Sequence, residues 1–431
     1  MKAIILAAGE GKRMKSDLPK VLHTVAGKPM LHCVIDSCKE AGIDDIVVVV
    51  GKGGKEVQKA TPSSVKFVWQ DEQLGTGHAV LCAVEHIKHD DHIIILYGDT
   101  PLITSDLLKN LISFQQEREA HGVIVSTPVP DPTGYGRIIT TPFGDFEGIV
   151  EQRDLSPQQE KIKSINPGVY MFTGRELLHG LAFVGNDNNQ HEYYLTDVPK
   201  ILKEHDFKVF VYSDPDYLQF LGVNSQKQLA EAATAMRSRI IDKHFENGVI
   251  IIDPSTVYID DDVEIEQGVT IHPGAILKGG CKIGKGTIIG PYTVAEDAVI
   301  GQDCRVGPFA YLRPGTVIGD RCRVGDFVEI KNSTLGNDTN AAHLAYIGDA
   351  KLGDGVNFGC GAITVNYDGA NKSLTEVEDG AFVGSNVNLV APVKVRSGAF
   401  VAAGSTIVDD VPQDALAIAR ERQVNKENYK K

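Results

Sequence analysis

Residues 265–290 read IEQGVT-IHPGAI-LKGGCK-IGKGTI-IG, and this stretch decides how the second half of the chain folds. Each group of six begins with isoleucine or leucine and carries a smaller residue four positions later. Large and small positions that recur every six residues are typical of a parallel β-helix, in which the large side chains stack inside successive coils and the small ones fill the corners. The stretch therefore predicts coils of a parallel β-helix.

The hexad pattern extends through most of the chain after Val249. The large residues form three runs, with a slip of one position between the first two: Ile265, Ile271, Leu277, Ile283 and Ile289; Val294, Ile300, Val306, Leu312, Ile318, Val324 and Ile330; Val377, Val383, Leu389, Val395, Val401 and Ile407. The smaller residues are Val269, Ala275, Cys281, Thr287, Cys304, Ala310, Thr316, Cys322, Val328, Thr334, Val387, Val393, Ala399 and Ser405. We expect the three cysteines among them to be buried core thiols and not catalytic groups. Residues 364–375 interrupt the repeat and should form a loop, a common place for functional residues on a rigid scaffold.

The first half of the chain alternates short apolar strands with helical stretches. The predicted strands are residues 2–6, 46–50, 66–69, 93–96 and 123–127, and the predicted helices are residues 29–41, 77–86 and 105–116. This alternation favours a parallel α/β sheet that binds ligands at the carboxyl ends of its strands. Residues 225–246 lack proline and glycine and have apolar residues at helical spacing, so they predict a connecting helix. We therefore expect domains at 1–224 and 248–431, joined by a linker helix at 225–247.

The composition excludes several classes of protein. The 431 residues include 43 basic and 57 acidic side chains, a net charge of −14 that argues against a large nucleic-acid footprint. The apolar run 3–8 is too short for a signal peptide, and no apolar run approaches the ~20 residues of a membrane span. The seven cysteines form no CxxC pair, so they indicate neither a disulfide framework nor a zinc site. We expect a cytoplasmic protein that binds neither nucleic acid nor membrane.

The loop after the first strand has the composition of a phosphate-binding site. Gly9-Glu10-Gly11 is followed by Lys12, Arg13 and Lys20. The two glycines alone would fit an ordinary strand–helix turn, and they lack the third glycine of a dinucleotide fingerprint. Exposed backbone N–H groups beside several cations, however, suit a triphosphate.

Two further segments of the first half carry polar groups at strand ends. Asp99 ends the apolar strand 93–96 and is well placed to bind a Mg²⁺ ion held with phosphates. The alternative is that it caps the next helix, although Ser105-Asp106 would cap that helix better. Gln70 and the glycine-rich turn 74–79 lie where the chain passes from the predicted strand 66–69 to the predicted helix 77–86.

These segments together resemble one family. The segment 6–20 is similar to the signature of sugar-phosphate nucleotidyltransferases. Gln70, residues 73–78, Tyr97-Gly98-Asp99, Gly134-Tyr135-Gly136-Arg137, Gly148-Ile149-Val150-Glu151 and Gly222-Val223-Asn224 resemble the bifunctional N-acetylglucosamine-1-phosphate uridylyltransferase/glucosamine-1-phosphate acetyltransferases of bacterial cell-wall precursor synthesis. The resemblance covers essentially the whole chain. It implies an α/β Rossmann-like nucleotidyltransferase domain followed by a left-handed parallel β-helix of hexapeptide repeats.

The resemblance also implies roles for residues of the first half. It assigns Leu6, Ala7, Ala8, Gly9 and Lys20 to the nucleotide, Gln70, Gly75 and Thr76 to the uracil, Tyr97 and Gly98 to the flanks of the site, Asp99 and Asn224 to Mg²⁺, and Gly136, Glu151 and Asn166 to the aminosugar. Pro167 stands where the family usually has a small hydroxyl residue. The uridylyl step needs no general base, because a sugar phosphate with its second pKa of ~6 is already an ionised nucleophile.

In the second half, a few polar residues stand out from the repeat and match the acetyltransferase part of the family. The resemblance makes His343 the general base, a natural role because histidine accepts protons near neutral pH and acetyl transfer needs a neutral amine. It assigns Arg313, Lys331, Tyr346 and Asn357 to the sugar phosphate, and Cys360, Asn366, Tyr367, Ser385, Ala403 and Arg420 to acetyl-coenzyme A. Cys360 stands where alanine is common, and no cysteine has a His–Asp setting that would indicate an acyl-cysteine.

The leading hypothesis is thus a two-site enzyme that uses acetyl-coenzyme A, UTP and glucosamine 1-phosphate and assembles as a homotrimer. One alternative is a sugar nucleotidyltransferase whose β-helix is a regulatory or oligomerising module. Others are a non-catalytic scaffold, or a related dual enzyme with looser substrate preference. The combination of His343, Tyr346 and the loop 366–369 distinguishes the leading hypothesis from the first alternative. Lys20, Asp99 and Asn224 together argue against the scaffold.

Overall fold

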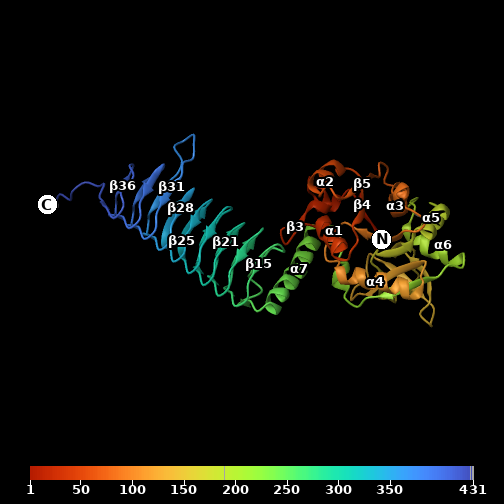
Figure 1. Ribbon diagram of the computed structural model, residues 1–431. Coiled ribbons are helices and arrows are strands. Elements are labelled where there is room, and N and C mark those ends of the chain that lie inside the picture. Colours follow the sequence, from red (N-terminus) through yellow and green to blue (C-terminus); the bar gives the residue numbers. More distant parts are fainter. Residues whose placement is uncertain (189, 428, 430–431) are drawn as a thin grey trace. The chain divides into compact units, whose positions relative to one another are not determined.

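The computed structural model describes residues 1–188, 190–427 and 429, which form two compact units, Met1–Met236 and Arg237–Lys431 (Figure 1). The division falls within helix α7 (Gln226–Glu246), which occupies the stretch predicted to be a connecting helix. In the described parts of the chain, no helix is long and apolar enough to cross a membrane.

The first unit contains one mixed sheet in the order β5-β4-β1-β6-β11-β7-β10-β8-β9, with β12 paired to β7. Its strands are β1 Lys2–Ala7, β4 Asp45–Val50, β5 Lys66–Trp69, β6 His92–Tyr97, β7 Gly122–Pro128, β8 Gly136–Thr140, β9 Phe146–Val150, β10 Ser164–Asn166, β11 Tyr170–Thr173 and β12 Val209–Ser213. A two-stranded ribbon, β2 Thr24–Val25 with β3 Lys28–Pro29, lies outside it.

The expectation of a parallel sheet is correct for β5, β4, β1 and β6 and wrong for much of the rest. β11 runs antiparallel to both of its neighbours, and β8, β9 and β10 also pair antiparallel. The reason is the connections: helices return the chain between the parallel strands, whereas a short turn joins β8 to β9, and a short turn permits only antiparallel pairing.

Helices cover both faces of this sheet. They are α1 Met30–Glu40, α2 Gly54–Ala60, α3 Thr76–Cys82, α4 Ser105–Arg118, α5 Gly174–Phe183 and α6 Val198–Glu204. Strand β1 shows how the two cores are divided, since Ala3 and Ile5 pack into one and Ile4 and Leu6 into the other. A strand buried on both faces exposes only its ends, so the carboxyl ends of β1 and β6 are where a ligand can approach.

The second unit is a parallel β-helix whose strands pair with those one coil away (Figure 1). Its strands are β13 Ile250–Ile251, β14 Tyr258–Ile259, β15 Glu264–Ile265, β16 Thr270–Ile271, β17 Ile276–Lys278, β18 Lys282–Ile283, β19 Ile288–Ile289, β20 Val294–Glu296, β21 Val299–Ile300, β22 Arg305–Val306, β23 Tyr311–Leu312, β24 Val317–Ile318, β25 Arg323–Lys331, β26 Thr334–Leu335, β27 Asn340–Gly348, β28 Ala350–Leu352, β29 Asn357–Phe358, β30 Ile363–Val365, β31 Thr375–Val377, β32 Phe382–Val383, β33 Asn388–Val390, β34 Val393–Val395, β35 Phe400–Val401, β36 Thr406–Ile407 and β37 Leu416–Ala417. Strands one coil apart pair in register, as Ile271 does with Ile289, so the predicted stacking of large residues is confirmed.

Two predicted core positions are wrong, and both lie where a side of the coil has five residues instead of six. Val294 is only half-buried, whereas Ala295 is fully buried and pairs with Leu277. Thr334 is exposed, whereas Ser333 is buried. A pattern of large apolar residues does not reveal a core position that holds alanine or serine. The predicted repeat is therefore one residue out of register at these two places.

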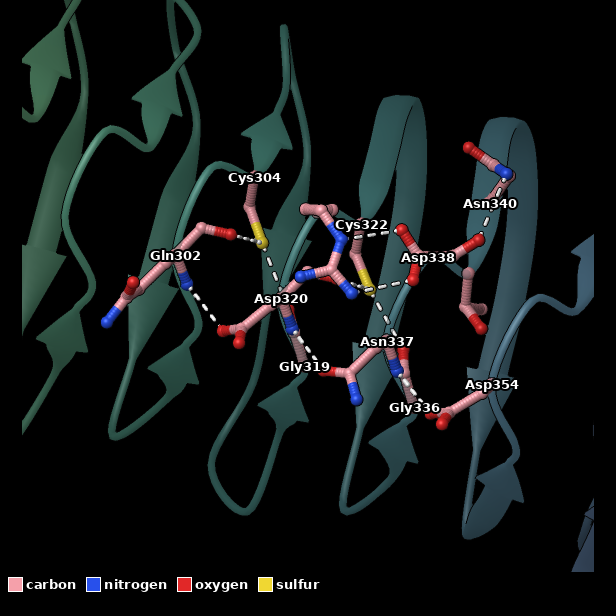
Figure 2. Close-up of polar contacts among 12 residues, drawn as sticks. Gln302, Cys304, Gly319, Asp320, Cys322, Gly336, Asn337, Asp338, Asn340 and Asp354 are labelled. Atoms are coloured by element: carbon pink, nitrogen blue, oxygen red, sulfur yellow. Dashed lines mark hydrogen bonds and ion pairs between the residues drawn. The ribbon is translucent and has the colours of Figure 1, made fainter.

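The expected buried thiols are confirmed, and hydrogen bonds fix them in the corners of the coils. Cys304 and Cys322 donate their S–H groups to carbonyls of the next coil, at 3.0 Å from Gly319 and 3.0 Å from Gly336 (Figure 2). Beside them, the side chains of Asp320, Asn337 and Asp354 each accept a backbone N–H from the preceding coil (Figure 2). These bonds satisfy backbone donors that the tight corners would otherwise leave without partners.

The predicted loop leaves the β-helix between β30 and β31 (Figure 1). Thr364 belongs to β30 and Thr375 begins β31, and both side chains are buried, so the loop is shorter at each end than expected.

Candidate active sites

A cavity of about 300 Å³ opens at the carboxyl ends of β1 and β6. Ten of the residues predicted to bind the nucleotide line it: Leu6, Ala7, Ala8, Gly9, Lys20, Gln70, Gly75, Thr76, Tyr97 and Asp99. Gly98 does not line the cavity but packs behind it, where a Cβ would come 3.3 Å from Ala7, Val21 and Leu31. The strand ends therefore bring distant segments of the chain into one site.

Lys20 is the point at which the predicted metal ligands converge. Its ammonium pairs with the Asp99 carboxylate and lies 3.1 Å from the side-chain oxygen of Asn224. The Lys20 and Asp99 side chains are only 11% and 16% exposed and line the cavity. Asn224, which is 204 positions from Lys20 in the sequence, is half-buried beside them and does not itself line the cavity. Two hard oxygen donors directed at one cation are the chemistry that Mg²⁺ requires, so the residues present fit that ion.

The uracil-binding prediction falls on a rigid turn. The buried Gln70 amide donates to the Gly75 carbonyl at 3.0 Å and contacts the His78 ring at 3.1 Å. Gly75 has φ of 104°, and a Cβ there would lie 2.6 Å from the Tyr193 carbonyl oxygen. The turn thus presents its polar groups in one fixed arrangement, and only glycine allows it.

A second cavity of about 280 Å³ adjoins the first, sharing Thr76, Tyr97 and Glu192 with it. The predicted sugar ligands Gly136, Glu151 and Asn166 line it. Burial raises the pKa of the Glu151 carboxyl, although a hydrogen bond from Thr196 opposes the shift. Burial, with the nearby Asp99 and Glu151 charges, raises the pKa of the Tyr97 hydroxyl, which remains a neutral donor.

Asn166 is oriented by its neighbours. Its amide nitrogen donates to the Tyr170 hydroxyl at 2.7 Å, and its oxygen accepts the N–H of Gly168 at 3.2 Å. Pro167 lacks an N–H, but the residue after it supplies the bond that holds this side chain. The departure at Pro167 therefore leaves the Asn166 amide fixed in place.

Sequence reasoning missed several residues of these cavities. Gln73 donates to the Ala8 carbonyl at 2.6 Å and lines the first cavity. Glu192 lines both cavities, and Tyr135 lines the second. Gln73 and Tyr135 lie inside motifs that resemble those of the family, so the sequence could have indicated them. Glu192 lies in a segment that has no recognisable motif.

In the second unit, the predicted base lies at a corner of the β-helix. His343 on β27 is in register with Asp326 on β25, and its Nδ1 lies 2.8 Å from the Asp326 carboxylate. The register of the following strands places Cys360, Ser385 and Ala403 at the same corner of successive coils. The predicted general base and three predicted coenzyme ligands therefore lie along one edge.

Two of the predicted sugar-phosphate ligands, Arg313 and Lys331, lie on the adjoining face in equivalent positions of successive coils. Arg313 pairs with Glu329 at 2.9 Å, and Lys331 lies on the next coil. Contact with Lys372, and the like charge of that ammonium, lower the pKa of Lys331. The Asp349 carboxylate is also close to both lysines and opposes this shift in Lys331. With Arg313, the two ammonium groups still give this face a local excess of positive charge, which favours binding of an anion.

Lys372 was not predicted, and it comes from the loop between β30 and β31. The same loop carries Asn366, whose amide donates to Asp349 at 2.5 Å, and Tyr367, whose hydroxyl donates to the Gly369 carbonyl at 2.6 Å. A polar hollow of about 360 Å³ beside it is lined by Lys372 and Asp349. None of the predicted sugar-phosphate ligands lines that hollow.

The remaining predicted residues are spread along the same coils. Tyr346 lies on β27, one coil from Glu329, and Asn357 begins β29. Cys360 is exposed. Arg420 follows β37 and donates to the Ala403 carbonyl at 2.9 Å.

Comparison with known proteins finds relatives for both halves of the chain. A model of the MobA-like NTP transferase domain matches residues 3–161, and a model of bacterial transferase hexapeptide repeats matches 262–295 and 297–332. The chain is 47% identical to the bifunctional protein GlmU of Geobacillus sp. (strain WCH70), over 99% of this chain and 97% of that protein. It is 48% identical to those of Brevibacillus brevis and Clostridium tetani, covering 99% and 100% of this chain and 96% and 98% of theirs.

Proposed function

Because this chain belongs to the family of bifunctional GlmU proteins, we propose that it makes UDP-N-acetylglucosamine in two steps. Residues 248–431 transfer an acetyl group from acetyl-coenzyme A to glucosamine 1-phosphate. Residues 1–224 then transfer UMP from UTP to the N-acetylglucosamine 1-phosphate formed, with release of pyrophosphate. The observation that carries the uridylyl step is the contact of Lys20 with both Asp99 and Asn224, next to a cavity that Lys20, Asp99 and the glycine-rich loop line.

The uridylyl site works by placing two anions together. The loop 6–9 and Lys20 hold the UTP phosphates, while Gln70 and Gly75 hold the uracil. Asn166 and Glu151 bind the aminosugar so that its phosphate oxygen lies in line with the bond to pyrophosphate. Asp99 and Asn224 would hold Mg²⁺, which when bound neutralises phosphate charge. No side chain has to remove a proton, because the attacking phosphate is already ionised.

At the acetyl site, a proton must leave the amine as the C–N bond forms and the C–S bond breaks. His343 accepts that proton, and Arg313, Lys331 and Lys372 hold the phosphate of the sugar. Asn366, Tyr367, Ser385, Ala403 and Arg420 contact the coenzyme, whose thiolate departs and is then protonated. The thioester is reactive enough for direct transfer, so Cys360 has no covalent role.

A nucleotidyltransferase with an inert β-helix is the competing function. Such a module has no need for a histidine held by a carboxylate, or for two lysines brought together on one face. Both features favour a catalytic second unit.

We further propose a cytoplasmic homotrimer assembled through the β-helix, with acetyl sites between neighbouring subunits. A stack of exposed aromatic rings supports this proposal. The ring centroids of Tyr292 and Phe309 lie 5.3 Å apart, and those of Phe309 and Phe327 lie 5.4 Å apart. Their exposed fractions of 58%, 47% and 60%, with Leu344 at 58%, are high for large apolar side chains. Contiguous exposed apolar surface of this kind is typical of interfaces.

Product analysis tests the proposal directly. The purified protein is given UTP, acetyl-coenzyme A and glucosamine 1-phosphate together, and then with each substrate omitted in turn. We expect UDP-N-acetylglucosamine only in the complete mixture, and N-acetylglucosamine 1-phosphate when UTP is omitted. UDP-glucosamine without acetylation would favour the inert β-helix instead.

A further inference from the structure

One contact at the acetyl site involves a residue to which no role has been assigned. Asp326 and His343 occupy equivalent positions on successive coils, with the carboxylate Oδ1 at 2.8 Å from the imidazole Nδ1. Each is followed by a residue of positive φ, Phe327 at 55° and Leu344 at 37°, so both corners turn in the same way. The shared backbone geometry fixes the two side chains next to each other.

The charges around the pair favour this contact. The hydrogen bond from His343 lowers the pKa of the Asp326 carboxyl, and the charge of Arg323 adds to the effect. Asp326 is therefore an acceptor at neutral pH, and the atom it faces must carry a hydrogen. The other titratable groups on the strands against β27 are Glu329 and Lys331, with Cys360 at the corner of the next coil.

We propose that Asp326 is a positioning residue for acetyl transfer: it accepts the Nδ1–H of His343, and so leaves Nε2 unprotonated and directed towards the substrate amine. This inference rests on the proposed function of the second unit. A carboxylate that holds an imidazole in one tautomer and orientation is a recurring device where histidine serves as the base. During the reaction Nε2 takes the amine proton, and Asp326 keeps its own charge and stabilises the imidazolium.

A role in stabilising the fold explains the contact between Asp326 and His343 less well. The side chains of His343 and Asp326 are 55% and 42% exposed, and exposed ion pairs contribute little to folding. The second unit should therefore keep its stability without the carboxylate, while the reaction should lose its oriented base.

The test compares Asp326→Asn with Asp338→Asn in the full-length protein. Asp338, labelled in Figure 2, forms a similarly exposed ion pair on the same β-helix. Its partner is Arg321, at 2.7 Å. We expect Asp326→Asn to lower the kcat of acetyl transfer by about 10- to 100-fold, with KM for glucosamine 1-phosphate within about twofold. Asp338→Asn should change neither quantity, and both variants should unfold at the wild-type temperature.

A spectroscopic measurement reads the tautomer without turnover. Magic-angle-spinning ¹⁵N NMR of histidine-labelled protein, with His343→Ala for assignment, should find Nδ1 protonated in the wild type and the alternative tautomer populated in Asp326→Asn. An unchanged tautomer with kcat within twofold of wild type would overturn the inference, as would an equal loss in Asp338→Asn. If the wild type forms no acetylated sugar while the tautomer still switches, the proposed function fails and the role of Asp326 in holding His343 stands.

Discussion

At the scale of single residues, His343 carries the chemistry of the second unit. Replacing it with alanine should lower acetyl-transfer turnover by about 10²–10⁴-fold, the usual value of a positioned general base. Uridylyl transfer should stay near the wild-type rate, because its residues belong to the other unit. Steady-state assays of both reactions measure this, and a fall of less than about tenfold across neutral pH would remove His343 from the role.

Gly168 shows how a residue without a side chain shapes the sugar site. A Cβ at this position would lie 2.1 Å from Cε2 of Tyr97, and its φ of 85° adds strain for any other residue. We expect Gly168→Ala to displace the Tyr97 ring and lower the kcat/KM of uridylyl transfer by up to about 100-fold.

Gly144→Ala is the matched control for that substitution. Gly144 has φ of 88°, but a Cβ there meets nothing within 4 Å. Both variants should lose about 1–2 kcal/mol of unfolding free energy to backbone strain. Equal losses of activity in the two would mean that strain, and not the displaced ring, is responsible.

Some functional residues could have been found in the sequence and others could not. Asp326 precedes His343 by 17 positions, which is one coil of the β-helix, so the repeat itself predicts their contact once the coil length is known. Lys372 lies in a loop that departs from the repeat, and nothing in the spacing indicates that it returns to Lys331. Loop geometry depends on contacts that a periodic pattern does not contain.

At the scale of elements, charged side chains tie the edge of the first sheet together. Lys2 on β1 lies 2.9 Å from Asp45 on β4, which also pairs with Lys66 on β5 at 2.8 Å. Partial burial alone would raise the pKa of Asp45, but hydrogen bonds from Lys66 and Lys2 lower it to about 2.

This lowered pKa predicts how the first unit responds to acid. A carboxyl whose pKa falls on folding stabilises the fold above its unfolded pKa of ~3.9 and loses that contribution as the pH falls through its folded value. The contribution should be on the order of 1 kcal/mol or less, because Asp45 is partly exposed. Fluorescence of Trp69, the single tryptophan, in β5 should therefore report steeper destabilisation between about pH 4 and pH 2 for the wild type than for Asp45→Asn. Parallel curves would show that the ion pairs are broken in solution.

The order of strands in the first sheet shows which elements the sequence pattern can predict and which it cannot. Strand–helix alternation correctly predicts β1, β4, β5 and β6, because an α-helix lies between each of these strands and the next strand of the sheet. It fails after β7, where β8 and β9 follow without helices and β11 is inserted between β6 and β7. That insertion depends on long-range pairing, to which local sequence contributes little.

At the scale of the whole molecule, the two units should separate by truncation within α7. Leu229, Ala232, Ala233 and Met236 on this helix pack against the first unit's Met14 and Val25 cluster, and a fragment ending at Arg239 keeps all four. We expect that fragment to be monomeric and to retain uridylyl transfer. Sedimentation and activity measurements test this, and a monomeric full-length protein that still acetylates would contradict the trimer.

The central claim is that two independent sites act in sequence, and mixing two inactive variants tests it most directly. Asp99→Ala should acetylate glucosamine 1-phosphate but transfer no UMP, and His343→Ala should transfer UMP but acetylate poorly. Given UTP, acetyl-coenzyme A and glucosamine 1-phosphate, neither variant alone should form substantial UDP-N-acetylglucosamine. The two together should form it at a rate near that of the wild type, because the intermediate diffuses from one protein to the other. Failure of the mixture, with both variants folded, would contradict the division of the two reactions between the two units.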